Sequence, residues 1–234
     1  MKVPVYNMQG DQVSTLDIDE QSLGGEVRPA LIKQAYVMYH ANLRQGSARS
    51  KCRSEINGSR HKIYKQKGTG NARHHDRKPN LFKGGSHAKA KKRVREDYHQ
   101  DMPKKMRRKA NRNALLAKLV DNEVKIVDRI DFAEVKTRAF ADLMSALKID
   151  RKALVALSSD PEKSRNARLS ARNVEDASLC RSDQLTAFEM LNHRYLVIEK
   201  DELEAWLSGP SSRMDKGAKN YGGKAAKAAA GEAG

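Results

Sequence analysis

The sequence predicts an α/β fold in which helices flank a largely parallel sheet, with a long extended basic loop inserted and a disordered C-terminal tail. Three observations support this prediction: strand and helix patterns alternate after residue 101, positive charge gathers in one internal stretch, and the last residues have low complexity. We expect a globular α/β domain at residues 1–43 and 101–209, an extended loop at 44–100, and the tail at 210–234.

The N-terminal part of the chain predicts a hairpin followed by a helix. Residues 3–6 and 13–18 have the composition of strands and flank a turn at residues 8–11. Residues 28–43 carry apolar side chains at i, i+4, i+7 and i+11, which predicts a helix with one apolar stripe. The stripe consists of Ile32, Tyr36, Tyr39 and Leu43.

Strand and helix patterns alternate from residue 101 onward. We expect Asp101 to cap a helix that runs to about Val120, basic in its first half and apolar from Ala114. Asp201 and Glu204 have the spacing of a capping box. The remaining expected elements are strands at 124–127, 153–157 and 195–198, and helices at 137–147, 183–192 and 201–207. This alternation is typical of a largely parallel sheet.

The excess positive charge is concentrated in one internal segment. The chain holds 46 Lys and Arg against 29 Asp and Glu, a net charge of +17. Residues 44–112 contain 23 of the basic and 5 of the acidic residues, which leaves 23 basic and 24 acidic residues elsewhere. With few apolar side chains, burial at about 25 cal/mol per Å² cannot offset ordering costs of about 1–2 kcal/mol per residue. A polyanion would allow this segment to fold, and nucleic acid is the first candidate.

Other kinds of site have little support in the sequence. The KQKGTG stretch at residues 65–70 lacks the spacing of a P-loop, and no Ser-His-Asp or Cys-His pattern stands out. We therefore expect no enzyme activity, no cofactor and no small-molecule substrate, and we expect polar contacts rather than metal binding from His74 and His75. Cys52 and Cys180 are expected to be reduced thiols, since they stand far apart without a CxxC motif.

Neither a membrane partner nor a targeting segment is expected. No apolar run approaches the roughly 20 residues that a membrane helix needs. The first residues, MKVPVYNMQGDQ, lack the long apolar segment of a signal peptide, and acidic residues soon follow. We therefore expect the protein to work in the compartment where it is made.

RNA is favoured over DNA as the polyanion. No zinc finger, basic zipper or clear helix-turn-helix is present. A long, glycine-punctuated arm suits the irregular junctions of folded RNA, where Tyr64, Phe82 and Tyr98 could stack on bases. Two alternatives stay open: a nucleoid or other DNA-binding protein, which would prefer duplex DNA, and an RNA-modifying enzyme, which would need catalytic residues and a cofactor loop.

Several short motifs resemble the large-subunit ribosomal protein L-four family of bacterial type. They are KQKGTG at 65–70, Gly84-Gly85, Asp97-Tyr98, PKKMRR at 103–108 and Ala114-Leu115. The resemblance covers about residues 1–207. It implies a structural constituent of the large subunit of a cytoplasmic ribosome, with an α/β domain on the subunit surface. It also implies a loop that stabilises rRNA folding in assembly and whose tip lines the peptide exit tunnel beside ribosomal protein L-twenty-two.

The resemblance and the charge together predict which residues bind rRNA. The tunnel tip is expected at Lys65, Gln66, Lys67, Gly68, Thr69 and Gly70, which also belong to the rRNA-binding set. The rest of that set comprises Arg49, Lys51, Arg53, Arg60, Lys62, Arg73, Arg77, Lys78, Lys83, Lys89, Lys91, Lys92, Arg93, Arg95, Lys104, Lys105, Arg107, Arg108 and Arg112.

The chain departs from the usual pattern of the family in the second half of the loop. Asn71 stands where arginine is usual, and Leu81-Phe82 stand where tryptophan is common. The usual apolar, glycine-rich segment is replaced at residues 84–92 by a longer and more basic one. This replacement predicts extra phosphate contacts by Lys89, Lys91, Lys92 and Arg93, which would be in solvent in a ribosome if the prediction were wrong.

Overall fold

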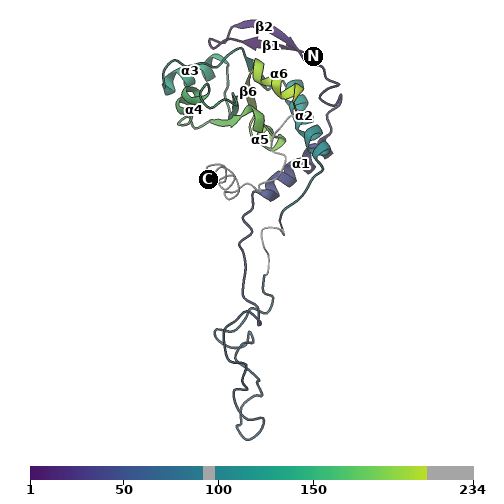
Figure 1. The fold of residues 1–234 in the computed structure, drawn as a ribbon, viewed down its shortest axis with the longest axis vertical. Helices are drawn as coiled ribbons and strands as arrows, with labels where there is room; N and C mark the ends of the chain where they lie inside the picture. Colours follow the sequence, from purple (N-terminus) through teal and green to yellow (C-terminus); the bar gives the residue numbers. More distant parts are fainter. Residues whose placement is uncertain (92–97, 210–234) are drawn as a thin grey trace, which may run out of the picture. The chain divides into compact units, whose positions relative to one another are not determined.

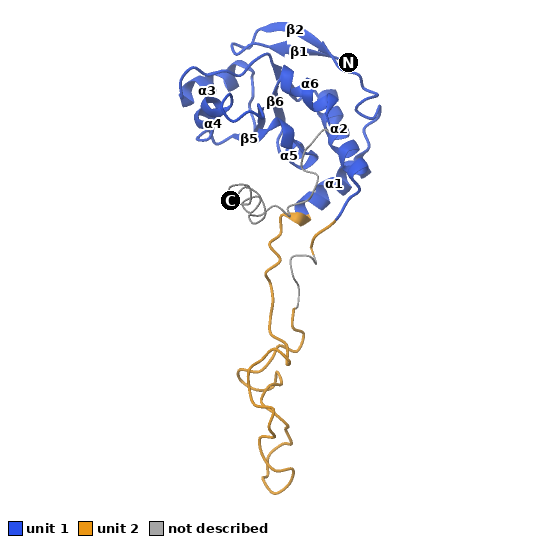
Figure 2. Ribbon diagram, in the orientation of Figure 1, with its two compact units in different colours: residues 1–40, 101–234 blue, residues 41–100 orange. Residues whose placement is uncertain are grey.

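The computed structural model describes residues 1–91 and 98–209 of the chain. The chain divides into two compact units, one formed by residues 1–40 and 101–234 and the other by residues 41–100 (Figure 2). We call them the core unit and the arm. The predicted tail at 210–234 and the predicted rRNA-binding residues Lys92, Arg93 and Arg95 lie outside the described residues.

Within the described residues of the core unit, six strands form one sheet in the order β2-β1-β3-β6-β4-β5. Figure 1 labels β1, β2 and β6 of this sheet. They are β1 (Lys2–Tyr6), β2 (Gln12–Asp17), β3 (Val124–Val127), β4 (Ala153–Leu157), β5 (Ala177–Arg181) and β6 (Tyr195–Glu199). Only the β1–β2 pairing is antiparallel among these strands. The predicted α/β class with a largely parallel sheet is therefore confirmed.

Helices cover both faces of the sheet. The helices α2 (Lys104–Val120), α5 (Ala187–Asn192) and α6 (Lys200–Ser208) contribute to one apolar cluster. The helices α3 (Thr137–Ala146) and α4 (Arg165–Ala171) contribute to another on the opposite face. The helix α1 (Pro29–Asn42) places Ala35 and Met38 against Met102 and Ala110 in a third, smaller cluster.

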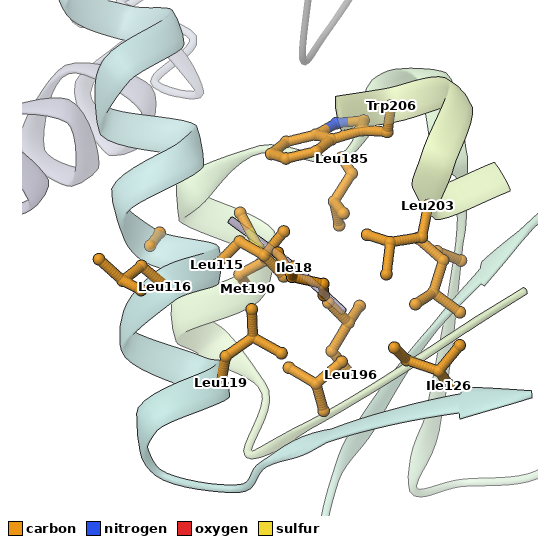
Figure 3. Packing of buried hydrophobic residues seen from close by; sticks show 14 of the residues in the cluster. Ile18, Leu115, Leu116, Leu119, Ile126, Leu185, Met190, Leu196, Leu203 and Trp206 are labelled. Atoms are coloured by element: carbon orange, nitrogen blue, oxygen red, sulfur yellow. The ribbon is translucent and has the colours of Figure 1, made fainter. Parts of the chain in front are cut away.

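Alternate residues of the central strands supply the two main clusters. In β6, Leu196 and Ile198 join the cluster of α2, α5 and α6, whereas Val197 joins the cluster of α3 and α4. Successive side chains of a strand point to opposite faces, so a strand covered on both faces needs apolar residues throughout. Figure 3 shows Leu115 of α2 and Trp206 of α6 converging on the first of these clusters.

Two predicted helix starts are wrong. The helix α2 begins at Lys104 with Pro103 in the N-cap position, and no side chain caps it, so Asp101 does not have the predicted role. The helix α6 begins at Lys200, directly after β6, and its start has no side-chain cap. The predicted capping box of Asp201 and Glu204 is therefore absent, because both residues already lie inside the helix.

The predicted helix at 183–192 is two elements. A short 3-10 turn at Ser182–Gln184 is separated from α5 by Leu185, whose backbone is extended. Thr186 then caps α5 by accepting a hydrogen bond of 3.4 Å from the backbone N–H of Glu189. The Thr-x-x-Glu spacing is the capping signal that could have located this start.

The apolar stripe predicted for α1 is wrong in part. Ile32 is buried, Tyr36 and Tyr39 are half-buried, and Leu43 is exposed because it lies beyond the last helical residue. Ala35 and Met38, which were not part of the predicted stripe, are buried as well. Together with Ile32 they follow the i, i+3 spacing of one helix face. None of the helices in the described ranges combines the length and apolar character that crossing a bilayer requires.

Candidate nucleic-acid interface

The described part of the arm is strongly basic and its few acidic groups are already paired. It contains 14 Lys and Arg and 2 acidic residues. Both carboxylates bind arginine: Glu55 pairs with Arg49, and the buried Asp76 accepts from Arg53 at 3.1 Å. The other 12 of the 14 cations therefore have no carboxylate within the described arm, and the positive charge is left for an external anion.

The base of the arm is closed by reciprocal hydrogen bonds. The buried Asn42 donates from Nδ2 to the carbonyl of Gln100 at 3.1 Å and accepts at Oδ1 from the N–H of Gln100 at 2.8 Å. The guanidinium of Arg44 lies 3.8 Å from the ring centroid of Tyr98. These contacts join the first and last residues of the arm to each other.

Further along, the arm is held by scattered backbone contacts rather than by a sheet. No helix or strand occurs in its described residues beyond the end of α1. The N–H of Ser50 donates to the carbonyl of Lys91, and the N–H of Ile63 donates to the carbonyl of His75, both at 2.9 Å. The outgoing and returning halves of the arm are thus connected at isolated points, which leaves most of its backbone groups for another partner.

The hydrogen bond between Ile63 and His75 closes the loop that carries the predicted tip. All six tip residues at 65–70 are exposed, and the hydroxyl of Tyr64 donates to the carbonyl of Ala72 across the loop. Gly68 and Gly70 have φ angles of +82° and +69°. A Cβ at either glycine would meet no atom within 4 Å, so the backbone conformation rather than crowding favours glycine here.

A close backbone approach shapes the returning half of the arm. The N–H of Gly85 donates to the carbonyl of Phe82 at 2.9 Å. A Cβ added to Gly85 would lie 2.0 Å from the carbonyl oxygen of Pro79, so no larger residue fits without a backbone shift. The ring of Phe82 packs edge-on against His74 with centroids 4.9 Å apart. Phe82, Tyr64 and Tyr98 all have partners within the arm, and base stacking by these rings stays a prediction.

The predicted rRNA-binding residues lie in different environments. Lys78 in the arm and Arg107 in α2 are buried, and Arg108 and Arg112 are half-buried. The other predicted cations in the described residues are exposed: Arg49, Lys51, Arg53, Arg60, Lys62, Lys65, Lys67, Arg73, Arg77, Lys83, Lys89, Lys91, Lys104 and Lys105. The described part of the arm thus presents nearly all of its predicted contacts to solvent.

Two asparagines in the middle of α2, which sequence reasoning missed, position other elements of the core unit. The Oδ1 of Asn111 accepts from the N–H of Ala187 at 2.9 Å, at the start of α5. Asn113 accepts from the N–H of Arg28 and donates to the carbonyl of Glu26, both at 2.6 Å, just before α1. Both asparagines are buried, so α2 is held in one rotation about its axis.

Arg112 lies between these asparagines and contacts three carbonyl groups. Its guanidinium donates to Leu207 at 2.9 Å and Gly209 at 3.2 Å, at the end of α6, and to Ser22 at 3.4 Å. A cation at a helix C-terminus satisfies carbonyls that have no helical partner. Arg112 therefore has a role in the fold, and its predicted contact with rRNA stays a prediction.

The Glu55 carboxylate gives the arm a pH-dependent contact. The backbone N–H of Cys52, 3.1 Å away, and then Arg49 lower the pKa of Glu55 from 4.5 to about 2. A lowered pKa means that the contact is complete above pH 4.5 and is lost as the pH falls through about 2. We expect the NMR shift of the Cys52 amide to titrate with a midpoint near 2. A midpoint near 4.5 would mean that the free arm does not form this contact, and Glu55→Gln should abolish the titration.

Metal binding finds no geometric support in the described ranges. No group of three or more His, Cys, Asp or Glu side chains lies close enough there to hold an ion. His74 contacts Phe82, and Asp76 pairs with Arg53, so these residues do not converge on one point.

Comparison with known proteins identifies the family. Residues 16–208 match the model of the ribosomal protein L4/L1 family. The large ribosomal subunit protein uL4 of Desulfatibacillum aliphaticivorans is 37% identical over 209 residues, which cover 87% of this chain and 96% of that protein. The proteins of the same name from Dehalococcoides mccartyi and Carboxydothermus hydrogenoformans are 39% and 36% identical, with 86% of this chain and 93% and 95% of those proteins covered. The chain therefore belongs to the ribosomal protein L4/L1 family.

Proposed function

We propose that this chain is a structural constituent of the large ribosomal subunit whose arm binds rRNA. Its relatives are named large ribosomal subunit proteins, and the family is structural rather than enzymatic, so the chain is not an enzyme. The observation that carries the RNA-binding proposal is the charge of the described part of the arm, where 14 cations stand against 2 carboxylates that are both paired. On this proposal the protein acts in the ribosome, in the cytoplasm.

The proposed mechanism is folding of the arm on RNA. Its isolated hydrogen bonds and few apolar side chains provide little stability alone, whereas phosphates would neutralise the lysines and arginines and accept from exposed backbone groups. As rRNA segments close around the arm, the arm orders and holds them together. The core unit contributes two anchored chain ends through α1 and α2.

We place the tip at residues 65–70, in the wall of the peptide exit tunnel beside ribosomal protein L-twenty-two. Two observations support this placement: the loop is closed behind the tip by Tyr64, and all six residues are exposed. Gly68 and Gly70, both at positive φ, add no side chain at the turn of this loop. Such a loop suits a crowded RNA wall better than a bulkier one.

Sedimentation of the native protein from a cell lysate tests the proposal. We expect it to migrate with the large ribosomal subunit and to remain there when the subunits are washed in high salt. An arm that lies between rRNA segments cannot leave the subunit until those segments separate. Migration with chromosomal DNA would support a DNA-binding protein instead. Migration as free protein would also contradict the proposal.

The tip placement is tested by reversing one charge. Lys67 is exposed and has no partner in the described residues, so Lys67→Glu should change the stability of the isolated protein by no more than about 0.5 kcal/mol. We expect large subunits to assemble in normal amounts, with altered chemical reactivity of tunnel-wall nucleotides. Lys152→Glu in the core unit is the control and should leave those nucleotides unchanged. If Lys67→Glu blocked subunit assembly, the tip placement would be wrong.

A further inference from the structure

A second basic feature lies in the core unit. A pocket of about 430 Å³ is lined by the loop at residues 21–24, by four cations of α2, and by Gly209. The four cations are Lys105, Arg108, Lys109 and Arg112, at the spacing i, i+3, i+4 and i+7. This spacing places them on one face of the helix, directed at one pocket. Sequence reasoning predicted three of them as RNA contacts and missed Lys109.

The pocket has an excess of positive charge. No carboxylate is among its lining residues, and within the described residues neither Lys105 nor Lys109 forms an ion pair. Like charges at i, i+4 destabilise an exposed helix by about 0.2–0.5 kcal/mol per pair. An anion bound between the two ammonium groups would relieve this repulsion. The surrounding cations favour an anion over a neutral or positively charged ligand.

The walls of the pocket are held in place without a ligand. Arg112, one of the lining residues, donates to the carbonyls of Ser22, Leu207 and Gly209. The loop opposite is fixed by Asp19, whose carboxylate accepts from the N–H of Gln21 at 3.0 Å and of Ser22 at 3.1 Å. A site that is already ordered loses little conformational entropy on binding.

We propose that this pocket binds a phosphate group, with Lys105 and Lys109 supplying the charge. Lysine ammonium groups bind phosphate as point charges from several directions, which suits an exposed pair on a rigid wall. The phosphate is either a phosphodiester of RNA, an inference that rests on the proposed function, or free inorganic phosphate. In either case the core unit has an anion site of its own, formed by residues outside the arm.

The test uses the full chain with both lysines neutralised, Lys105→Gln and Lys109→Gln. The control is Lys33→Gln with Lys152→Gln, which removes the same charge from exposed positions that do not line the pocket. In a titration with inorganic phosphate followed by NMR, the amides of Ser22 and Gly24 should shift and saturate in the wild type and the control. The double variant should show no saturable shift. Equal shifts in all three proteins, or none in the wild type, would overturn the proposal.

Binding to purified large-subunit rRNA distinguishes the two sources of phosphate. If the pocket holds an RNA phosphodiester, the slope of log K against log salt should be shallower in the double variant by about 1.4–1.8, from two lost contacts. An unchanged slope with the phosphate titration intact would assign the pocket to free phosphate. Wild-type protein without measurable rRNA binding would contradict the proposed function, while the phosphate titration would still decide the pocket.

Discussion

Replacing six exposed cations of the arm with glutamine is expected to weaken rRNA binding by roughly four to five orders of magnitude at about 0.1 M salt. The six are Lys65, Lys67, Arg73, Lys83, Lys89 and Lys91. Each phosphate contact contributes about 0.7–0.9 to the slope of log K against log salt, so six lost contacts should make the slope shallower by about 4–5. Filter binding to purified large-subunit rRNA over a series of salt concentrations measures both quantities.

A variant of the core unit with the same change in net charge is the control. Six exposed cations there are replaced by glutamine: Lys2, Lys33, Arg138, Lys148, Lys152 and Lys163. If RNA responds only to net charge, both variants should lose affinity equally. Parallel salt plots for the wild type and the arm variant would contradict the assignment of the arm as the electrostatic contact.

Leu115→Ala is expected to destabilise the core unit by about 2–5 kcal/mol, a large part of the roughly 5–15 kcal/mol that holds a domain folded. Leu115 of α2 is fully buried and packs in the cluster of α2, α5 and α6. Its truncation removes apolar contacts and leaves a cavity in an already close-packed cluster. Urea unfolding followed by fluorescence measures the effect, because Trp206 is the one tryptophan of the chain and is buried in the same cluster.

Val120→Ala at the end of the same helix is the matched control. Val120 is 54% exposed, and we expect its truncation to change the free energy of unfolding by no more than about 0.5 kcal/mol. Similar losses in the two variants would mean that burial does not determine the loss, since alanine has the higher helix propensity at both positions. An unchanged midpoint for Leu115→Ala would contradict the packing described for this face.

The elements that could be predicted from the sequence are those whose burial is visible in the local pattern of apolar residues. The strands β3 and β4 have apolar residues at most positions because helices cover both faces, and both were predicted with the bounds that the structure has. The helix α4 was missed because its buried side chains are the small ones of Ala167, Ser170 and Ala171. Strand β5 was missed as well, because it is a half-buried edge strand that depends on pairing with β4.

The candidate site could be predicted in its charge and not in its contacts. Counting residues along the chain is enough to find the basic segment. The ion pair of Arg53 with Asp76 joins residues that are 23 positions apart, and the bond of Asn111 to Ala187 joins residues 76 positions apart. Nothing local distinguishes a cation that anchors the fold, such as Arg112, from one that stays exposed in the arm. Only the folded chain separates the two.

The small cluster of Ala35, Met38, Met102 and Ala110 has a consequence for the length of the arm. It joins the residues just before and just after the arm, so the core unit closes the intervening chain into a loop. The entropy lost on loop closure grows only with the logarithm of loop length, and doubling the length costs about 0.6 kcal/mol. Inserted residues, such as those expected in the basic segment at 84–92, should therefore affect the stability of the core unit very little. The length of the arm can follow the distance that it must span, while the fold that anchors it stays the same.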